Sequence, residues 1–189
     1  MENYKKNLEL LTKNHVYSKE MEHDACGVGL IASTEGKKSR AIVENGIQAL
    51  KAVWHRGAVD ADGKTGDGAG IHVEIPKDFF IEKIQVTGHD YDNSEICVGM
   101  IFLPRNNYSA QESCKTIVES ELTKNNFSIY GWRQVPVNPK VLGEKALQTM
   151  PEIIQVLFKS NDPNLLDKNL ERKIYETRKR IENKAFDAS

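Results

Sequence analysis

The spacing of apolar residues along the chain predicts a mixture of strands and helices. An apolar, β-prone run begins at Cys26 and predicts a strand over 26–33, which a turn over 35–38 ends. After Ser39, a candidate N-cap, apolar residues recur with the 3.6-residue period of a helix as far as Trp54. The remaining pattern predicts strands over 71–75, 96–103, 127–137 and 152–159, and helices over 77–83, 108–124 and from Pro163 onward. This order indicates a mixed α+β fold whose sheet is antiparallel at least in part.

Two segments fall outside this regular pattern. Residues 1–25 hold one short apolar cluster among charges, so they are expected to add little to a core and are a candidate leader. Residues 55–70 contain five glycines, which allow positive φ and a close approach to a ligand. On composition alone, an ordinary flexible loop is an equal alternative. The loop departs from the calcium-binding pattern at Lys64 and Thr65, and its glycine spacing fits neither phosphate-loop nor dinucleotide motifs.

Composition narrows the class of protein. The 189 residues are enough for one domain or for part of a larger one, and 39% hydrophobic with 28% charged residues indicates a folded chain. A net charge of −1 without a basic stripe argues against nucleic acid and anionic membranes as partners and favours a small polar ligand. The longest apolar runs fall short of the roughly 18 residues of a membrane span, so a cytoplasmic location is expected.

The cysteines and histidines carry no metal or disulfide pattern. Three cysteines without a C-x-x-C pair predict reduced thiols, and the five histidines lack the spacing of metal ligands, so no metal is expected. Cys97 lies within a predicted strand and Cys114 within a predicted helix, and both are expected to be small core residues. Cys26 differs from them because it heads a strand next to two small-residue loops.

The position of Cys26 suggests an amino-terminal nucleophile. A cysteine at the first position of a mature chain can use its own α-amine, with a pKa near 8, as general base. The scheme requires removal of residues 1–25, and the small Ala25 with Gly27 and Gly29 fits it. A cysteine–histidine pair of the papain kind is the alternative, but a cysteine at the start of a strand lacks the helix dipole that stabilises such a thiolate.

Four stretches together resemble a known family. They are Asp24 to Gly29, Leu50 to Ala58, Thr65 to Gly70 and Tyr130 to Pro136. They are similar to the amino-terminal region of the glutamate synthase large subunit, a class II glutamine amidotransferase domain of the N-terminal-nucleophile hydrolase type. The resemblance runs from about residue 22 to the end of the chain, and it implies an αββα sandwich.

The resemblance assigns roles to particular residues. It implies that Cys26 forms a γ-glutamyl thioester with glutamine and releases ammonia, and that residues 1–25 are a propeptide. Arg56 matches the arginine that holds the substrate α-carboxylate, a role suited to a planar cation with two donor edges. Gly66, Asp67 and Gly68 are expected to border the pocket.

One departure from the family concerns the oxyanion hole. In the family this hole is an Asn-Gly pair that lies beyond residue 189, as does the aspartate that binds the substrate amino group. Asn45-Gly46 falls inside a predicted helix and is not expected to replace that pair. The resemblance therefore implies that residues 26–189 are the front portion of an incomplete domain, inactive toward glutamine by itself.

The resemblance also implies what the whole enzyme contains. FMN and an iron–sulfur cluster belong to the synthase domain of the full-length enzyme, and no cofactor is expected in this chain. The expected partners are glutamine and the rest of the large subunit, and the family allows a small subunit as well. Two alternatives stay open: a non-catalytic interaction or structural domain that keeps the Cys26 strand for packing, and a stand-alone amidohydrolase, which the missing oxyanion pair disfavours.

Overall fold

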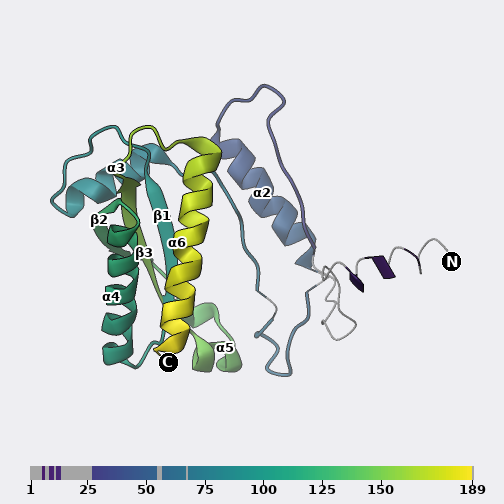
Figure 1. Cartoon of the computed structure of the whole chain (residues 1–189). Helices are drawn as coiled ribbons and strands as arrows, with labels where there is room; N and C mark the ends of the chain where they lie inside the picture. The colour runs from purple at the N-terminus through teal and green to yellow at the C-terminus, as the bar shows by residue number, and fades with distance from the viewer. Residues whose placement is uncertain are drawn as a thin grey trace. The chain divides into compact units, whose positions relative to one another are not determined.

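The computed structural model describes residues 6, 9–10, 12–13, 27–54, 57–66 and 68–188 (Figure 1). The chain divides into two units. The first comprises residues 1–58 and 67–71, and the second comprises residues 59–66 and 72–189. Among the first 26 residues, the described ones are helical and exposed, which agrees with a small contribution to a core.

The first unit contains helix α2, Arg40–Ala52, within the predicted range. Ser39 is the N-cap residue, as predicted, with extended backbone, but its side chain makes no capping hydrogen bond. Lys51 in the last turn complements the negative end of the helix dipole. No residue of α2 is fully buried, although its apolar residues have the helical period.

Two predicted strands are not strands in the structure. Described residues 27–33 and 71–75 have irregular backbone. A strand requires a neighbour that pairs with its N–H and C=O groups, and within the described residues neither segment has one. Their apolar side chains are correspondingly open to solvent, with Val28 93% and Leu30 89% exposed.

The second unit is built on a three-stranded sheet of order β1-β3-β2, and its antiparallel pairing agrees with the prediction of a sheet that is antiparallel at least in part. Its strands are β1, Cys97–Leu103, β2, Phe127–Gln134, and β3, Glu152–Ser160. Strand β3 is central: Cys97 pairs with Phe158 on one side, and Phe127 pairs with Ser160 on the other. The β2–β3 register shifts between Ile129 and Gly131.

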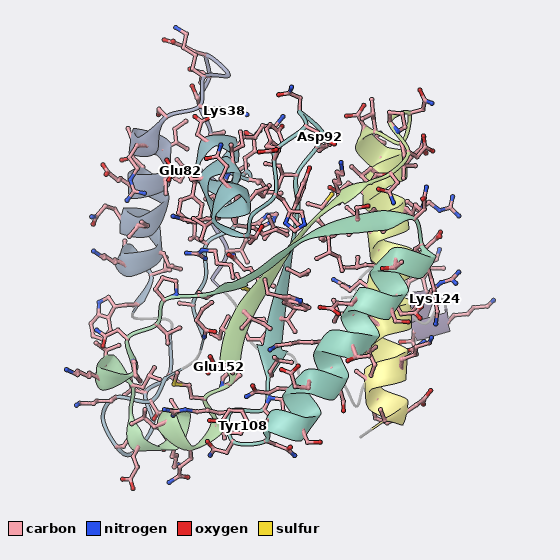
Figure 2. All side chains as sticks on the ribbon, turned by 90° about the vertical axis from the view of Figure 1, so that its left-hand side faces the viewer. Lys38, Glu82, Asp92, Tyr108, Lys124 and Glu152 are labelled. Atoms are coloured by element: carbon pink, nitrogen blue, oxygen red, sulfur yellow. The ribbon has the colours of Figure 1, made fainter. Side chains whose placement is uncertain are left out.

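Helices cover both faces of this sheet, and Figure 2 shows the sheet between them. Helix α4, Tyr108–Lys124, and helix α6, Asp167–Asp187, lie on one face, and helix α3, Lys77–Val86, lies on the other. The core under α4 and α6 consists of buried residues Cys97, Val118, Leu122, Phe127, Val156, Phe158 and Leu170. The core under α3 consists of Phe80, Ile84, Ile96, Tyr130 and Leu157. The layers thus form a mixed α+β unit, in agreement with the predicted class.

A buried carboxylate joins the two helices of the first face. The Glu121 side chain in α4 is only 4% exposed, and its Oε1 lies 2.5 Å from Nζ of Lys184 in α6. Lys124 Nζ lies 3.4 Å from the same oxygen. The Lys184 ammonium holds the pKa of Glu121 below its usual value, so the carboxylate stays ionised and paired.

The connection between β2 and β3 contains two elements that the pattern did not predict. They are the 3₁₀ turn η2, Pro139–Val141, and helix α5, Glu144–Thr149. Asn138 caps η2, since its side chain accepts a hydrogen bond from the backbone N–H of Lys140. None of the helices in the described ranges is long and apolar enough to cross a membrane.

Candidate active site

Three of the five predicted site residues, Cys26, Arg56 and Asp67, lie outside the described residues. Their roles therefore stay predictions. Gly66 and Gly68 are described, and both are exposed. Gly66 forms an antiparallel bridge with Val59, and an added Cβ at Gly68 would meet nothing within 4 Å.

Helix α2 brings together segments that flank the predicted site within the first unit. Gly27 follows Cys26, and a Cβ added to it would lie 3.7 Å from Cγ2 of Val53, next to the last turn of α2. Ile71 ends the glycine-rich loop, and its Cδ1 would lie 3.1 Å from a Cβ at Gly46 in the middle of α2. Gly46 thus sits inside the helix, as predicted, where its missing side chain leaves room for Ile71.

A backbone hydrogen bond joins the described residues on either side of positions 55 and 56. The backbone N–H of Gly57 donates to the carbonyl of Trp54 at 2.9 Å. A Cβ at Gly57 would lie 3.3 Å from that carbonyl oxygen, so a small residue suits this position. The Trp54 side chain is 75% exposed. The described residues nearest to Arg56 in the sequence, Trp54 and Gly57, are therefore linked directly through their backbones.

Within the glycine-rich loop, Val59–Gly66 forms a hairpin that belongs to the second unit. The backbone N–H of Asp60 donates to the Thr65 carbonyl at 2.6 Å, and the Gly63 N–H donates to the Asp60 carbonyl at 2.9 Å. Gly63 has φ of +68°, a conformation that glycine adopts without the steric cost of a side chain. The segment is thus an ordered turn and not a structureless connection.

Asp62 is the polar centre of this hairpin. Its Oδ1 accepts hydrogen bonds from the backbone N–H groups of Lys64 at 2.9 Å and Thr65 at 2.7 Å. Its Oδ2 accepts a third, from the Thr65 hydroxyl, at 2.5 Å. These bonds, that of the Thr65 hydroxyl first, hold the pKa of Asp62 well below its usual range. The carboxylate therefore serves the fold of the loop.

The two described cysteines are unsuited to the nucleophilic role. Cys97 is buried in the core under α4 and α6, as predicted, and burial raises the pKa of its thiol to about 12, with Glu95 and Glu171 adding to the effect. It stays protonated at neutral pH and is a poor nucleophile. Cys114 is half-buried on α4.

A polar cluster that the sequence did not reveal joins the α3–β1 connection to the sheet. The Tyr130 hydroxyl donates to Oδ1 of Asp92 at 2.9 Å, and Lys159 pairs with the other carboxylate oxygen. Lys159 holds the pKa of Asp92 well below its usual range, while burial and the neighbouring Asp92 raise that of Tyr130. Tyr130 belongs to one of the four family-like stretches, and here it fixes the connection to the sheet. The cluster is structural, since it ties Asp92 to β2 and β3.

Residues 26–189 match the family model described as glutamine amidotransferases class-II. The chain therefore belongs to the class II glutamine amidotransferases. It is 52% identical over 179 residues to the glutamate synthase [NADPH] large chain of Azospirillum brasilense, a match that covers 95% of this chain and 12% of that protein. It is 40% identical over 174 residues to the ferredoxin-dependent glutamate synthase of Pyropia yezoensis, with 92% of this chain and 11% of that protein covered.

A third relative is also a glutamate synthase that is much longer than this chain. The ferredoxin-dependent glutamate synthase 1, chloroplastic/mitochondrial, of Arabidopsis thaliana is 39% identical over 162 residues, which are 85% of this chain and 10% of that protein. The chain thus spans between 10% and 12% of the length of these three relatives. The resemblance inferred from the four sequence stretches is confirmed at the level of the family.

Proposed function

We propose that this chain is the nucleophile-bearing part of the amidotransferase domain of a glutamate synthase. In the whole protein the domain would hydrolyse the side-chain amide of glutamine and supply ammonia for glutamate synthesis from 2-oxoglutarate. The observation that carries the proposal is the family match, which begins at Cys26 itself and extends to residue 189. That starting point also supports the division into a leader, residues 1–25, and an amidotransferase portion, residues 26–189.

The proposed chemistry uses the first residue of the processed chain. The α-amine of Cys26 takes the thiol proton, and the sulfur attacks the side-chain carbonyl carbon of glutamine. Collapse of the tetrahedral intermediate breaks the C–N bond, and the α-ammonium returns the proton to the leaving ammonia. Water then hydrolyses the γ-glutamyl thioester, which releases glutamate and restores the thiol. Arg56 would hold the substrate α-carboxylate through paired hydrogen bonds.

The geometry of the first unit supports a common pocket for these groups. The neighbour of Cys26, Gly27, lies against the end of α2, and the hydrogen bond between Gly57 and Trp54, which flank Arg56 in the sequence, comes directly after that helix. The end of the glycine-rich loop, at Ile71, contacts the same helix. One helix would thus position the segments that adjoin Cys26 and Arg56 in the sequence and the far end of the loop that contains Gly66, Asp67 and Gly68.

We propose further that the complete domain is the αββα sandwich of N-terminal-nucleophile hydrolases. The sheet β1-β3-β2 with α4 and α6 on one face would form two of its four layers. Helix α3 covers part of the other face, and beyond it Met100 and Phe102 in β1 are 48% and 63% exposed, which suits a surface that a second sheet covers.

The cofactors of a glutamate synthase would be held elsewhere in the enzyme. An iron–sulfur cluster requires several cysteines together. The two described cysteines are one buried in β1 and one half-buried on α4, and the described residues contain no group of three or more metal-ligating side chains. FMN and the cluster would therefore belong to the synthase part, which would receive the ammonia, in a cytoplasmic enzyme.

The decisive experiment measures ammonia release by the protein extended with its downstream coding sequence. Cys26→Ala should abolish glutamine hydrolysis, because the thioester cannot form. Cys114→Ser, a substitution at a half-buried cysteine on α4, is the matched control and should retain it. Intact-mass analysis of the active protein should find a chain that begins at Cys26. An active Cys26→Ala protein, or full activity with Met1 to Ala25 retained, would refute the proposal, and an inactive wild type would favour the non-catalytic domain.

A further inference from the structure

We propose that Asp60, Asp62 and Lys145 are positioning residues that clamp the Val59–Gly66 hairpin onto helix α5. By this clamp they would hold the loop that borders the glutamine pocket. The pocket role rests on the proposed function, whereas the clamp itself consists of contacts between described residues of the second unit.

The first contact is an ion pair between distant parts of the sequence. Nζ of Lys145, in the first turn of α5, lies 2.8 Å and 2.7 Å from the two carboxylate oxygens of Asp60, which is 85 residues away along the chain. The ammonium therefore bridges both oxygens of one side chain. The side chains of Lys145 and Asp60 are 61% and 35% exposed, so this pair alone contributes modestly to stability.

The second contact is close packing against Gly143, which precedes α5. A Cβ added to Gly143 would lie 2.5 Å from the backbone nitrogen of Thr65, and it would overlap the Thr65 hydroxyl and the Asp62 carboxylate. Gly143 has φ of −72°, so space is the reason that a glycine is required here. The backbone N–H of Ala146 also donates to the Thr65 hydroxyl at 3.4 Å. Gly143 and Ala146 thus both contact the hairpin at Thr65, Gly143 by close packing and Ala146 by a hydrogen bond.

These contacts fix the position of Gly66. The hairpin is closed internally by the bonds of Asp62 and by the Val59–Gly66 bridge, so an anchor at Asp60 and Thr65 restrains the whole segment. Gly66 ends the hairpin, and the chain continues from there into residues 67–71 of the first unit. A loop that is already held in its bound conformation pays less ordering entropy when a ligand binds. The clamp would therefore act mainly on the affinity for glutamine.

The test begins with hydrogen exchange in the full 189-residue chain. Lys145→Met should raise the exchange rate of the 59–66 amides by roughly three- to fivefold, the factor expected for one exposed ion pair. Gly143→Ala should raise it by about tenfold or more, since the added methyl group forces the hairpin away. Lys145→Arg keeps the cation and should restore most of the protection. Lys140→Met and Glu144→Ala, at exposed neighbours, are matched controls and should leave exchange unchanged.

The second measurement is glutaminase kinetics in the extended protein. Gly143→Ala should raise KM for glutamine by about three- to tenfold with a smaller change in kcat, because binding and not bond cleavage loses its organised loop. Unchanged exchange of residues 59–66 in both Lys145→Met and Gly143→Ala would overturn the clamp. A loosened hairpin with unchanged KM would overturn its role at the pocket. A wild type that releases no ammonia would refute the proposed function and with it the pocket role, while the exchange data would still decide whether the clamp exists.

Discussion

The two units of the chain differ in how they use apolar residues. In the described part of the chain, every fully buried apolar residue lies between Phe80 and Leu170, in the second unit. In the first unit α2 has no fully buried residue, and Val28, Leu30 and Trp54 are 93%, 89% and 75% exposed. Since burial of apolar surface is the main favourable contribution to folding, the second unit supplies most of the stability that the described residues provide.

The predicted chemistry is concentrated in the unit with less burial. Cys26, Arg56, Asp67 and Gly68 all fall in the first unit, and of the predicted site residues only Gly66 falls in the second. Catalytic groups need precise placement, which rigid surroundings provide. A well-packed sheet in one unit does not by itself organise a site in the other. We therefore expect the proposed site to depend on the contacts that α2 makes with Gly27 and Ile71, and on the clamp that holds the Val59–Gly66 hairpin.

The largest expected effect on stability comes from opening a cavity in the core of the sheet. Leu157 in the central strand β3 is fully buried, so Leu157→Ala should lower the free energy of unfolding by about 2–5 kcal/mol. Leu50→Ala in α2 is the matched substitution in the first unit, where the side chain is only half-buried, and should cost about 1 kcal/mol or less. Urea denaturation of both variants measures the difference. Equal losses would show that α2 is packed as tightly as the sheet.

A smaller difference in stability between the two units is expected when one glycine in each is replaced by alanine. Gly131 in β2 has φ of +147°, and a Cβ there would lie 2.8 Å from Cγ2 of Thr87, so Gly131→Ala should cost roughly 1–3 kcal/mol through strain and overlap. A Cβ at Gly29 in the first unit would meet nothing within 4 Å, and Gly29→Ala should change stability by less than about 1 kcal/mol. Thermal unfolding of the two variants checks this. A Gly29→Ala loss as large as that of Gly131→Ala would mean that the first unit is more constrained than its exposure indicates.

The sequence predicted the second unit well because its signals are local. The pattern gave the bounds of α4, 108–124, as the structure has them, and in the structure Asn107 is its N-cap. The apolar runs of β1 and β3 are confirmed within one residue at each end. Strand β2 ends at Gln134, before the predicted 137. Period and capping are properties of neighbouring residues, so a single sequence contains them.

The failures depend on partners that are distant along the chain. Residues 27–33 and 71–75 have strand-like composition, but composition does not supply the second strand that a ladder needs. Helix α5 has six residues, too few for a clear period, and its contacts are with a hairpin about 80 residues earlier. At the proposed site, the family motifs predict roles for Cys26 and Arg56, whereas the pairing of Lys145 with Asp60 has no local signal.

The smallest expected effects on stability come from removing one ion pair in each unit. Asp92 pairs with Lys159, whose side chain is 22% exposed, and Arg40 pairs with Glu44 in α2, where the side chains are 73% and 61% exposed. Asp92→Asn should cost about 1 kcal/mol at pH 7 and still let the amide oxygen accept the Tyr130 hydroxyl. Glu44→Gln should cost about 0.3–0.5 kcal/mol, as for an exposed pair on a helix.

The pH dependence follows from the lowered pKa of Asp92. Folding favours its ionised form, chiefly through Lys159, so the stabilisation is complete above the ordinary aspartate pKa of 3.8 and is lost as the pH falls through the lower value of the folded state. The difference in unfolding free energy between wild type and Asp92→Asn should therefore be constant from pH 7 to about 5 and shrink steadily as the pH falls below about 4. Urea titrations at these pH values measure it. A difference that is as large at pH 2 as at pH 7 would show that the amide disturbs the cluster through its shape, and that the charge of Asp92 does not stabilise the connection between α3 and β1.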